Sequence, residues 1–137
     1  METFQTMQTP SRPTVVAPDG SDVRNLLRLD GGSLALFELA SGGISIPEVH
    51  RTVDEIWYIL SGRGEMWRKL GSLEETVILE KGVCLTIPVG THFQWRSDGS
   101  EPLVVLGVTM PPWPGEAEGY QVDGVWKPTI DTSPALE

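Results

Sequence analysis

The sequence predicts an all-β protein that folds as a single small barrel or sandwich, and three observations carry that prediction. Short runs rich in β-branched and aromatic residues recur roughly every ten residues along the chain. Glycine-rich turn sequences such as DGG, SGG and EKG separate these runs. No segment places apolar residues at helical spacing across three turns. Strands of this length and spacing are typical of β-sandwiches and β-barrels.

Each strand is predicted from an apolar, β-branched or aromatic run that a turn signal ends. In the first half of the chain these runs are TVV, NLLRL, SLALFEL and EIWYIL, at 14–16, 25–29, 33–39 and 55–60. In the second half they are GEMWRKL, ETVIL, VCLTI, HFQWR and LVVLGVT, at 64–70, 75–79, 83–87, 92–96 and 103–109. The turns DGG, SGG, SGRG, EKG and SDGS stand between them.

Length and charge limit the classes of partner. A chain of 137 residues is long enough for one domain with its own core. Its formal net charge of −9 argues against nucleic-acid binding and against attraction to an anionic membrane. No apolar run approaches a membrane span, and the first residues lack the apolar core of a signal peptide, so we expect a cytoplasmic protein. The lone Cys84 lies in the run VCLTI and is predicted to be a buried thiol.

The composition divides the chain into three parts. We expect an N-terminal arm or edge strand over 1–24, a barrel over 25–110 and an extended segment over 111–137. That last segment is rich in proline and glycine yet keeps three large aromatic residues, which a disordered tail would lack. We therefore expect its rings to dock on the barrel or on a second subunit; they are Trp113, Tyr120 and Trp126.

The stretch GGISIPEVHRTVDEIWYILSG, residues 42–62, has glycine, glutamate and histidine residues at a recognisable spacing. It resembles the first motif of the cupin superfamily, G-x5-H-x-H-x(3,4)-E-x6-G. The motif positions fall on Gly42, Glu48, His50, Glu55 and Gly62, with Glu48 standing where the family has its first histidine.

The stretch GVCLTIPVGTHFQW resembles the second cupin motif, G-x5-P-x-G-x2-H-x3-N. Gly82, Pro88 and Gly90 occupy their expected places. His92 comes one residue before the motif histidine, and Ser97 replaces the asparagine. The two motifs in order imply a cupin-type jelly-roll barrel, which agrees with the strand pattern.

The resemblance implies one divalent transition metal inside the barrel, held by three histidines and one glutamate. This chain has only two histidines, so the ligands it can offer are His50, Glu55, His92 and Glu48. Glu48 and His50 are two residues apart and therefore project to the same face of a strand. Imidazole with carboxylate suits Fe, Mn, Ni, Cu or Zn. Small single-barrel cupins often pair through their outer strands, so a homodimer is also implied.

The side on which His92 lies depends on the register of its strand. Alternation places Phe93, Trp95 and Ser97 inside and His92 outside, unless a bulge shifts the register by one residue. We expect an apolar pocket for a small molecule beside the charged cluster. Its lining residues are predicted to be Trp57, Phe93, Trp95 and, with a partial shift, Gln94.

Two functional hypotheses follow, and the sequence identifies no catalytic residue for either. In the first, a metal held by the four ligands serves an oxygenase, isomerase or lyase that acts on a small organic molecule. In the second, a metal-free barrel binds or senses a small ligand, or isomerises it with His50 as general base and Glu55 as its orienter.

Overall fold

The structure is a computed structural model that describes residues 3–129, and its regular secondary structure is almost entirely β-strand. The strands of the first half are β1 (Val15–Val16), β2 (Asp22–Leu29), β3 (Gly32–Leu39), β4 (Glu48–His50), β5 (Asp54–Ser61) and β6 (Arg63–Leu70). The second half contains β7 (Leu73–Glu80), β8 (Cys84–Ile87), β9 (His92–Ser97), β10 (Leu103–Met110), the 3₁₀ turn η1 (Glu116–Glu118) and β11 (Gly119–Gln121). No helical segment within residues 3–129 has the length and apolarity needed to cross a membrane.

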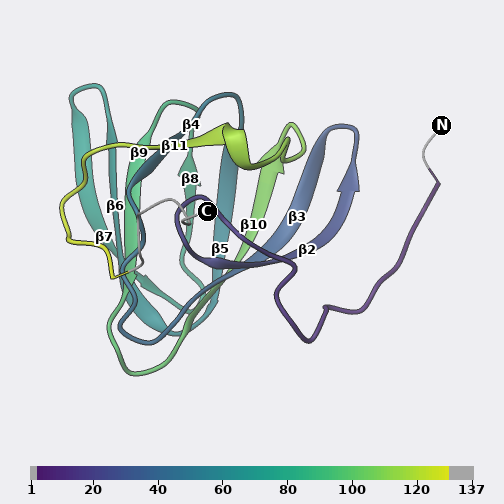
Figure 1. Cartoon of the computed structure of the whole chain (residues 1–137), viewed down its shortest axis with the longest axis horizontal. Coiled ribbons are helices and arrows are strands. Elements are labelled where there is room, and N and C mark those ends of the chain that lie inside the picture. Colours follow the sequence, from purple (N-terminus) through teal and green to yellow (C-terminus); the bar gives the residue numbers. More distant parts are fainter. Residues whose placement is uncertain (1–2, 130–137) are drawn as a thin grey trace, which may run out of the picture.

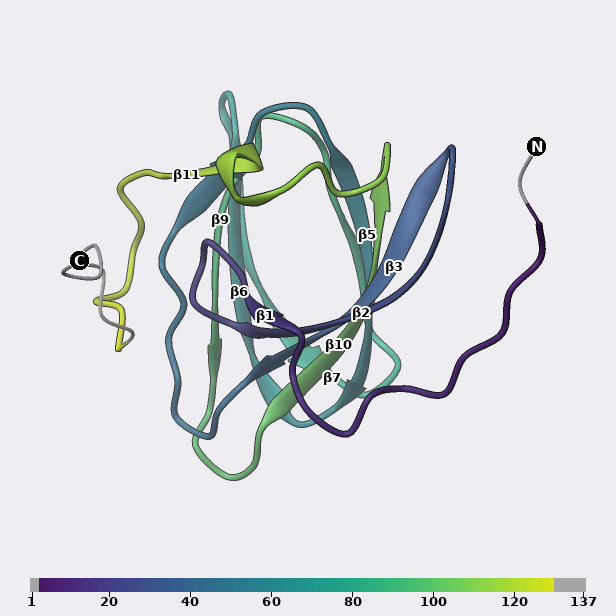
Figure 2. The ribbon, with the colours of Figure 1, turned by 45° about the vertical axis from the view of Figure 1, so that its right-hand side comes forward.

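The strands form two antiparallel sheets that face each other around a common core (Figure 1). One sheet has the order β1-β2-β3-β10-β5-β8, and the other has the order β11-β4-β9-β6-β7. Turning the molecule shows that the two sheets enclose an interior between them, as in a jelly roll (Figure 2). The predicted all-β jelly-roll fold is therefore confirmed.

The core follows from the alternation of side chains along the strands. On β5 and β10, every second residue is buried, which places Trp57 and Ile59 of β5 and Val105 of β10 inside. The aromatic residues Phe93 and Trp95 of β9 complete the inner layer. Each such side chain stabilises the fold by about 1.5–3 kcal/mol when fully buried, so the barrel has a core that needs no bound ion.

Alternation also corrects the prediction for the single cysteine. β8 has the burial pattern exposed, buried, exposed, buried, which turns Leu85 and Ile87 inward and Cys84 outward. Cys84 is exposed, so the predicted buried thiol is wrong. An apolar run on a half-buried strand carries apolar residues on both faces, and the composition of the run alone does not separate them.

The strands predicted from the sequence correspond to nine of the observed strands among the described residues, with ends that differ by up to three residues. The largest shift is at β2, which begins at Asp22, three residues before its predicted start at residue 25. The short strands β4 and β11 had no strand range of their own in the prediction. They pair with each other, with Gly119 opposite His50 and Gln121 opposite Glu48.

Residues 111–129 form a C-terminal strap that crosses one end of the barrel from β10 to β4 (Figure 2). The Glu118 carboxylate holds the strap by accepting hydrogen bonds from the backbone N–H groups of Thr52 and Val53 and from the Thr52 hydroxyl. Farther along the strap, Gln94 Oε1 accepts from the backbone N–H groups of Val125 and Trp126. The described part of the aromatic segment thus packs on its own barrel.

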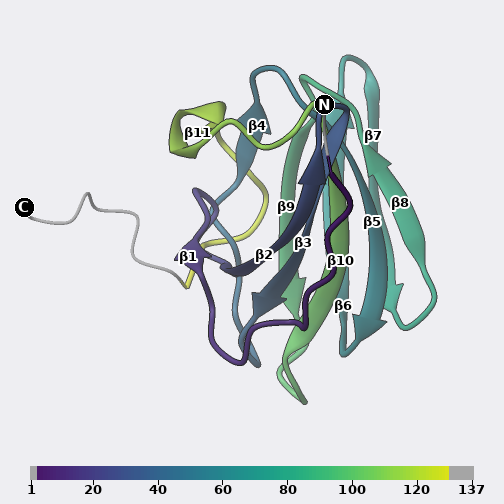
Figure 3. The same ribbon diagram turned by 90° about the vertical axis from the view of Figure 1, so that its right-hand side faces the viewer.

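The N-terminal arm, residues 3–13, is exposed and runs outside the barrel. The loop between β1 and β2 lies near β4 and the strap, as a view from the side shows (Figure 3). In that loop, the Asp19 carbonyl oxygen accepts a hydrogen bond from the backbone N–H of Ile46 at 2.9 Å. This contact brings Asp19 to the same end of the barrel as β4.

Candidate functional site: a buried acidic pocket

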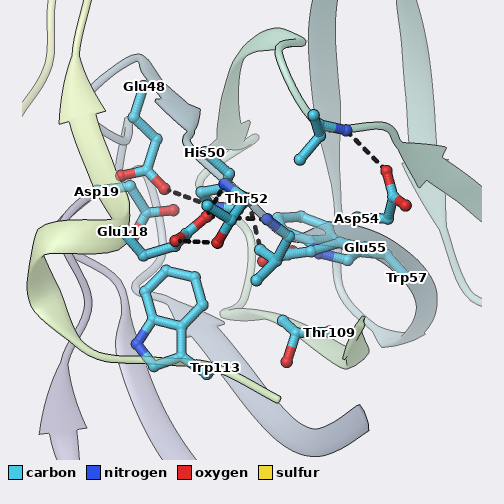
Figure 4. Close-up of polar contacts among 12 residues, drawn as sticks. Asp19, Glu48, His50, Thr52, Asp54, Glu55, Trp57, Thr109, Trp113 and Glu118 are labelled. Carbon is cyan, nitrogen blue, oxygen red and sulfur yellow. Dashed lines mark hydrogen bonds and ion pairs between the residues drawn. The ribbon is translucent and has the colours of Figure 1, made fainter. Parts of the chain in front are cut away.

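The centre of the site is formed by β4 and the start of β5. Glu48 and His50 lie on one face of β4 and point into the barrel, and both are less than 5% exposed. Glu55 is equally buried at 3% and points inward from β5 (Figure 4). Its neighbour Asp54 points outward and accepts a hydrogen bond from the Val89 backbone N–H at 2.8 Å, so Glu55 is the inward carboxylate.

The polar side chains of the site form a chain from one wall to the other. His50 Nε2 lies 2.8 Å from Glu48 Oε1, a hydrogen-bond distance. His50 Nδ1 lies 3.4 Å from Glu55 Oε2, within ion-pair range although the pair forms no hydrogen bond. On the far side, the Trp57 indole N–H donates to Glu55 Oε1. His50 is therefore flanked by a carboxyl group on each side of its ring.

Burial changes the proton affinity of both carboxyl groups. Burial raises the pKa of Glu55 to about 7, although His50 and the hydrogen bond from Trp57 lower it. Burial also raises the pKa of Glu48 well above its usual range, and the negative charges of Asp19 and Glu118 raise it further. Near neutral pH the cluster can therefore hold a proton on a carboxyl group.

A cavity of about 80 Å³ opens beside this cluster. Its walls come from both sheets, from the loop before β2 and from the strap. Trp113 of the strap lies over His50 with its ring edge-on, at 5.3 Å between ring centroids. Phe93, on the neighbouring strand β9 of the same sheet, meets His50 at 5.2 Å, also edge-on. The imidazole thus sits between two aromatic rings at the wall of the cavity.

Asp19 belongs to the site although the sequence did not nominate it. Its Oδ1 atom accepts from the Ser21 backbone N–H and from the Ser21 hydroxyl. Its Oδ2 atom accepts from the Trp95 indole N–H at 2.9 Å. Asp19 is 4% exposed and lines the cavity, so it is a buried carboxylate held by three donors.

Two of the predicted site residues lie elsewhere. His92 points out of the barrel and lines a surface groove with Trp67 and Lys69. No bulge shifts β9 where it pairs with β6, so the alternation frame holds and His92 is not with the other predicted ligands. Gln94 is buried, but its amide is on the outer face, where it bonds the strap and the Ser45 carbonyl.

Of the predicted pocket residues, Trp57 and Phe93 line the cavity. Trp95 lies in the core behind Trp57, with ring centroids 4.8 Å apart, and reaches the site through its bond to Asp19. Trp113 and Glu118 were predicted only as part of a docking segment. A turn sequence at Asp19 and an aromatic strap were visible in the sequence, but neither shows which end of the barrel it will meet.

The Cupin domain family matches residues 35–109 of the chain. This chain is a cupin. An uncharacterized protein of Methanocaldococcus jannaschii, MJ1618, is 32% identical over 106 residues, which cover 74% of this chain and 82% of the relative. The family assignment made from the two motifs is therefore confirmed.

Solved structures agree with the cupin fold. An uncharacterized protein with a double-stranded β-helix domain from Klebsiella pneumoniae superposes with a TM-score of 0.63 at 18% identity, over 82% of this chain and 90% of its own. KdgF from Halomonas gives 0.65 at 16% identity over 80% and 97%. Oxalate decarboxylase from Bacillus subtilis gives 0.65 at 18% identity over 82% and 30%. At these identities the likeness shows the fold alone.

The ligands of this cupin do not reproduce the three-histidine, one-glutamate set that the family resemblance implies. Phe93 stands at the position of the second-motif histidine and faces His50 with an apolar edge. His50 Nε2 is already bonded to Glu48, and no group of three His, Cys, Asp or Glu side chains within residues 3–129 is arranged to hold a metal ion. A metal centre of the family type therefore does not fit the residues present.

Proposed function

We propose that this cupin binds a small organic molecule in the buried pocket without a metal, and that the Glu48–His50–Glu55 chain exchanges protons with it. The observation that carries the proposal is that His50 lies at the cavity wall between two buried carboxyl groups. This arrangement supports general acid–base chemistry, in which a proton is removed from one atom of the ligand and returned to another. An isomerisation is the reaction class that requires only these two proton transfers.

Each residue of the chain has a distinct part in this proposal. His50 is the general base, because its ring lines the cavity and its Nδ1 atom has no hydrogen-bond partner, while Nε2 is bonded to Glu48. Glu55 orients the imidazole and is itself fixed by the Trp57 indole N–H. In the empty pocket Glu48 is the second proton holder, because burial and neighbouring negative charge raise its pKa.

The cavity limits the size of the ligand. A volume of about 80 Å³ is roughly half that of an engineered apolar cavity known to bind benzene, about 150 Å³. A molecule of only a few non-hydrogen atoms fits the enclosed space. A larger substrate would require Trp113 of the strap or the loop before β2 to move.

The proposal is tested by screening small molecules with NMR in the presence of a chelator. Binding is followed through the indole N–H signals of Trp57 and Trp113, which line the cavity, with Trp67 on the outer face as the internal control. We expect a molecule that shifts the first two signals in wild type and in His92→Ala but not in His50→Ala. Ligands that bind only when metal is restored would contradict the metal-independent pocket.

A reduced metal site is the second candidate, and one observation favours it. Glu48 Oε2 and His50 Nδ1 are buried polar atoms without a hydrogen-bond partner, which is unusual unless a ligand or ion is bound. As they stand, these side chains and Glu55 are not arranged as a metal group. If they turned toward one point, two carboxylates and one imidazole would suit Fe, Mn or Zn, and the ion would supply Lewis-acid chemistry. Stoichiometric metal that disappears in His50→Ala would favour this candidate.

A homodimer through the larger sheet is also proposed. Its outer face carries two apolar rows, Leu36–Leu106–Tyr58 and Leu34–Val108–Ile56, in which Tyr58 and Ile56 are 47% and 45% exposed. A second copy placed face to face would cover these rows. Sedimentation should give a dimer for wild type and a monomer for Tyr58→Lys. A cytoplasmic location stays an expectation from the sequence.

A further inference from the structure

We propose that the pocket selects a small organic cation, specifically an aliphatic ammonium group, with Glu48 and Asp19 as its counter-ions. This inference rests on the proposed function, because it names the ligand class of the same pocket. It also excludes the anionic small molecules that an arginine-lined pocket would take.

The charges on the cavity wall are almost all negative. Four carboxyl residues line it, Asp19, Glu48, Glu55 and Glu116, and no lysine or arginine is among the described lining residues. The arginine nearest to the cluster in sequence, Arg51, donates to the Ala117 carbonyl and lies over the Tyr120 ring. An anion entering the pocket would meet no lysine or arginine among the described lining residues, whereas a cation would relieve repulsion among the carboxylates.

Glu48 provides the open acceptor for such a ligand. Its Oε1 atom is occupied by His50, but Oε2 is buried and has no partner. A buried carboxylate oxygen without a donor is costly, and an ammonium N–H would satisfy it. Asp19 contributes negative charge from the loop before β2 and lies beside Glu48 (Figure 4). Its own oxygens are held by Ser21 and Trp95, so its position is fixed in advance.

The remaining walls are aromatic, which suits the same ligand class. Phe37, Trp57, Phe93 and Trp113 line the cavity. An ammonium group beside such rings gains cation–π attraction, and this attraction is stronger where water is excluded. The rings also accommodate the methyl or methylene groups that an organic cation carries, which a hydrated metal ion does not.

The cavity volume selects among organic cations. At about 80 Å³, the enclosed space accepts a short alkylammonium ion better than a bulky or multiply substituted one. Propylammonium is therefore a suitable probe. Propan-1-ol and propionate have the same carbon chain with a neutral and a negative head group, and they serve as matched competitors.

The experiment is an NMR titration of the full chain with these three probes, read from the Trp57 and Trp113 indole signals with Trp67 as control. We expect propylammonium to bind at least about tenfold more tightly than propan-1-ol, the discrimination given by one hydrogen bond to a charged group, and propionate not to bind. Equal affinity for the alcohol and the amine, or a preference for propionate, would overturn the cation inference while leaving a metal-independent pocket intact. No binding by any of the three, with metal restoring it, would overturn the proposed function as well.

Two variants locate the cation. Glu48→Gln keeps the shape of the side chain and the contact with His50 but removes the charge, and we expect it to lower propylammonium affinity about tenfold with little change for propan-1-ol. Glu75→Gln removes an exposed carboxylate that pairs with Arg68 on the outside, and it should change neither. An unchanged preference in Glu48→Gln would show that the ammonium group does not lie at Glu48.

A metal-ion arm separates the two kinds of cation. Mn²⁺ or Zn²⁺ added to wild type should not displace propylammonium from the pocket at equimolar concentration, because the aromatic walls give a hydrated ion little to replace its water. Displacement by either ion at that concentration would assign the open Glu48 oxygen to a metal and overturn the inference.

Discussion

The two histidines of this cupin stand on adjacent strands of one sheet and have opposite surroundings. His50, on β4, is 4% exposed, bonded to Glu48 and flanked by Glu55 at the cavity. His92, on β9, faces outward beside Lys69 and a surface groove. The first motif, through β4 and β5, thus provides all three residues of the proton-exchanging chain that we propose, and the second motif provides the apolar Phe93 on β9. A one-residue offset of a histidine on a β-strand changes its face and removes it from the site.

Phe93→His tests this comparison with the largest expected effect. The substitution places an imidazole at the motif position, where the Phe93 ring now lies 5.2 Å from that of His50. Two imidazoles with Glu48 and Glu55 form a ligand set that suits Fe, Zn or Mn, so we expect metal affinity to rise by roughly tenfold or more over wild type. Isothermal titration with Zn²⁺ measures it.

The matched control for Phe93→His is the double substitution with His50→Ala, which should lose the gain. A folded Phe93→His variant with the Zn²⁺ affinity of wild type would mean that the side chain at position 93 does not approach His50 as described. Thermal unfolding of both variants verifies that they remain folded.

Glu118→Gln tests how the strap holds the loop between β4 and β5 in place. Burial alone would raise the pKa of Glu118, but hydrogen bonds from Thr52 and Val53 bring it below its usual value. A lowered pKa means that the carboxylate stabilises the fold above about pH 4.5, its unperturbed value, and that this stabilisation is lost as the pH falls through the folded pKa. We expect Glu118→Gln to lose about 1–3 kcal/mol at pH 7.

Urea unfolding of wild type and Glu118→Gln at a series of pH values measures this difference. The two curves should converge as the pH falls below 4.5 and through the lowered pKa of the folded protein, where the wild-type carboxylate becomes protonated. A difference that stays constant from pH 7 to pH 3 would mean that the charge of Glu118 does not hold the strap.

Gly119→Ala is a smaller perturbation, on the strand β11 that pairs with β4. A Cβ atom at this position would lie 2.9 Å from Glu48 Oε2, so the carboxylate would have to turn away. Because the carboxylate is the flexible end of a side chain, we expect only a small loss of stability but a clear loss of propylammonium binding. Gly31→Ala is the control, since a Cβ there meets nothing within 4 Å. Equal binding in both variants would separate Glu48 from the ligand.

The two histidines also show how far sequence reasoning reaches. The spacing from Gly42 to Gly62 placed Glu48, His50 and Glu55 together, because turn geometry and strand alternation depend mainly on local sequence. Alternation along β9 placed Phe93 inside and His92 outside, and the structure follows that frame. Local patterns were therefore enough for the barrel and for the centre of the site.

The rest of the site depends on contacts between distant segments. Asp19 meets Trp95 across 76 residues of chain, and Glu118 meets Thr52 across 66. Gln94 is buried on an outer face only because the strap covers it. No periodicity or motif spacing encodes which barrel end a loop or strap will meet, so these residues were found only in three dimensions.

The measurement that tests the central claim most directly is elemental analysis of the purified full chain beside His50→Ala, by plasma mass spectrometry on protein prepared without chelator. The metal-independent pocket requires both proteins to carry well below one equivalent of Fe, Mn, Ni, Cu or Zn, with no difference between them, even after metal is offered and excess removed. Near-stoichiometric metal in wild type that is lost in His50→Ala would contradict it and would make Glu48, His50 and Glu55 metal ligands.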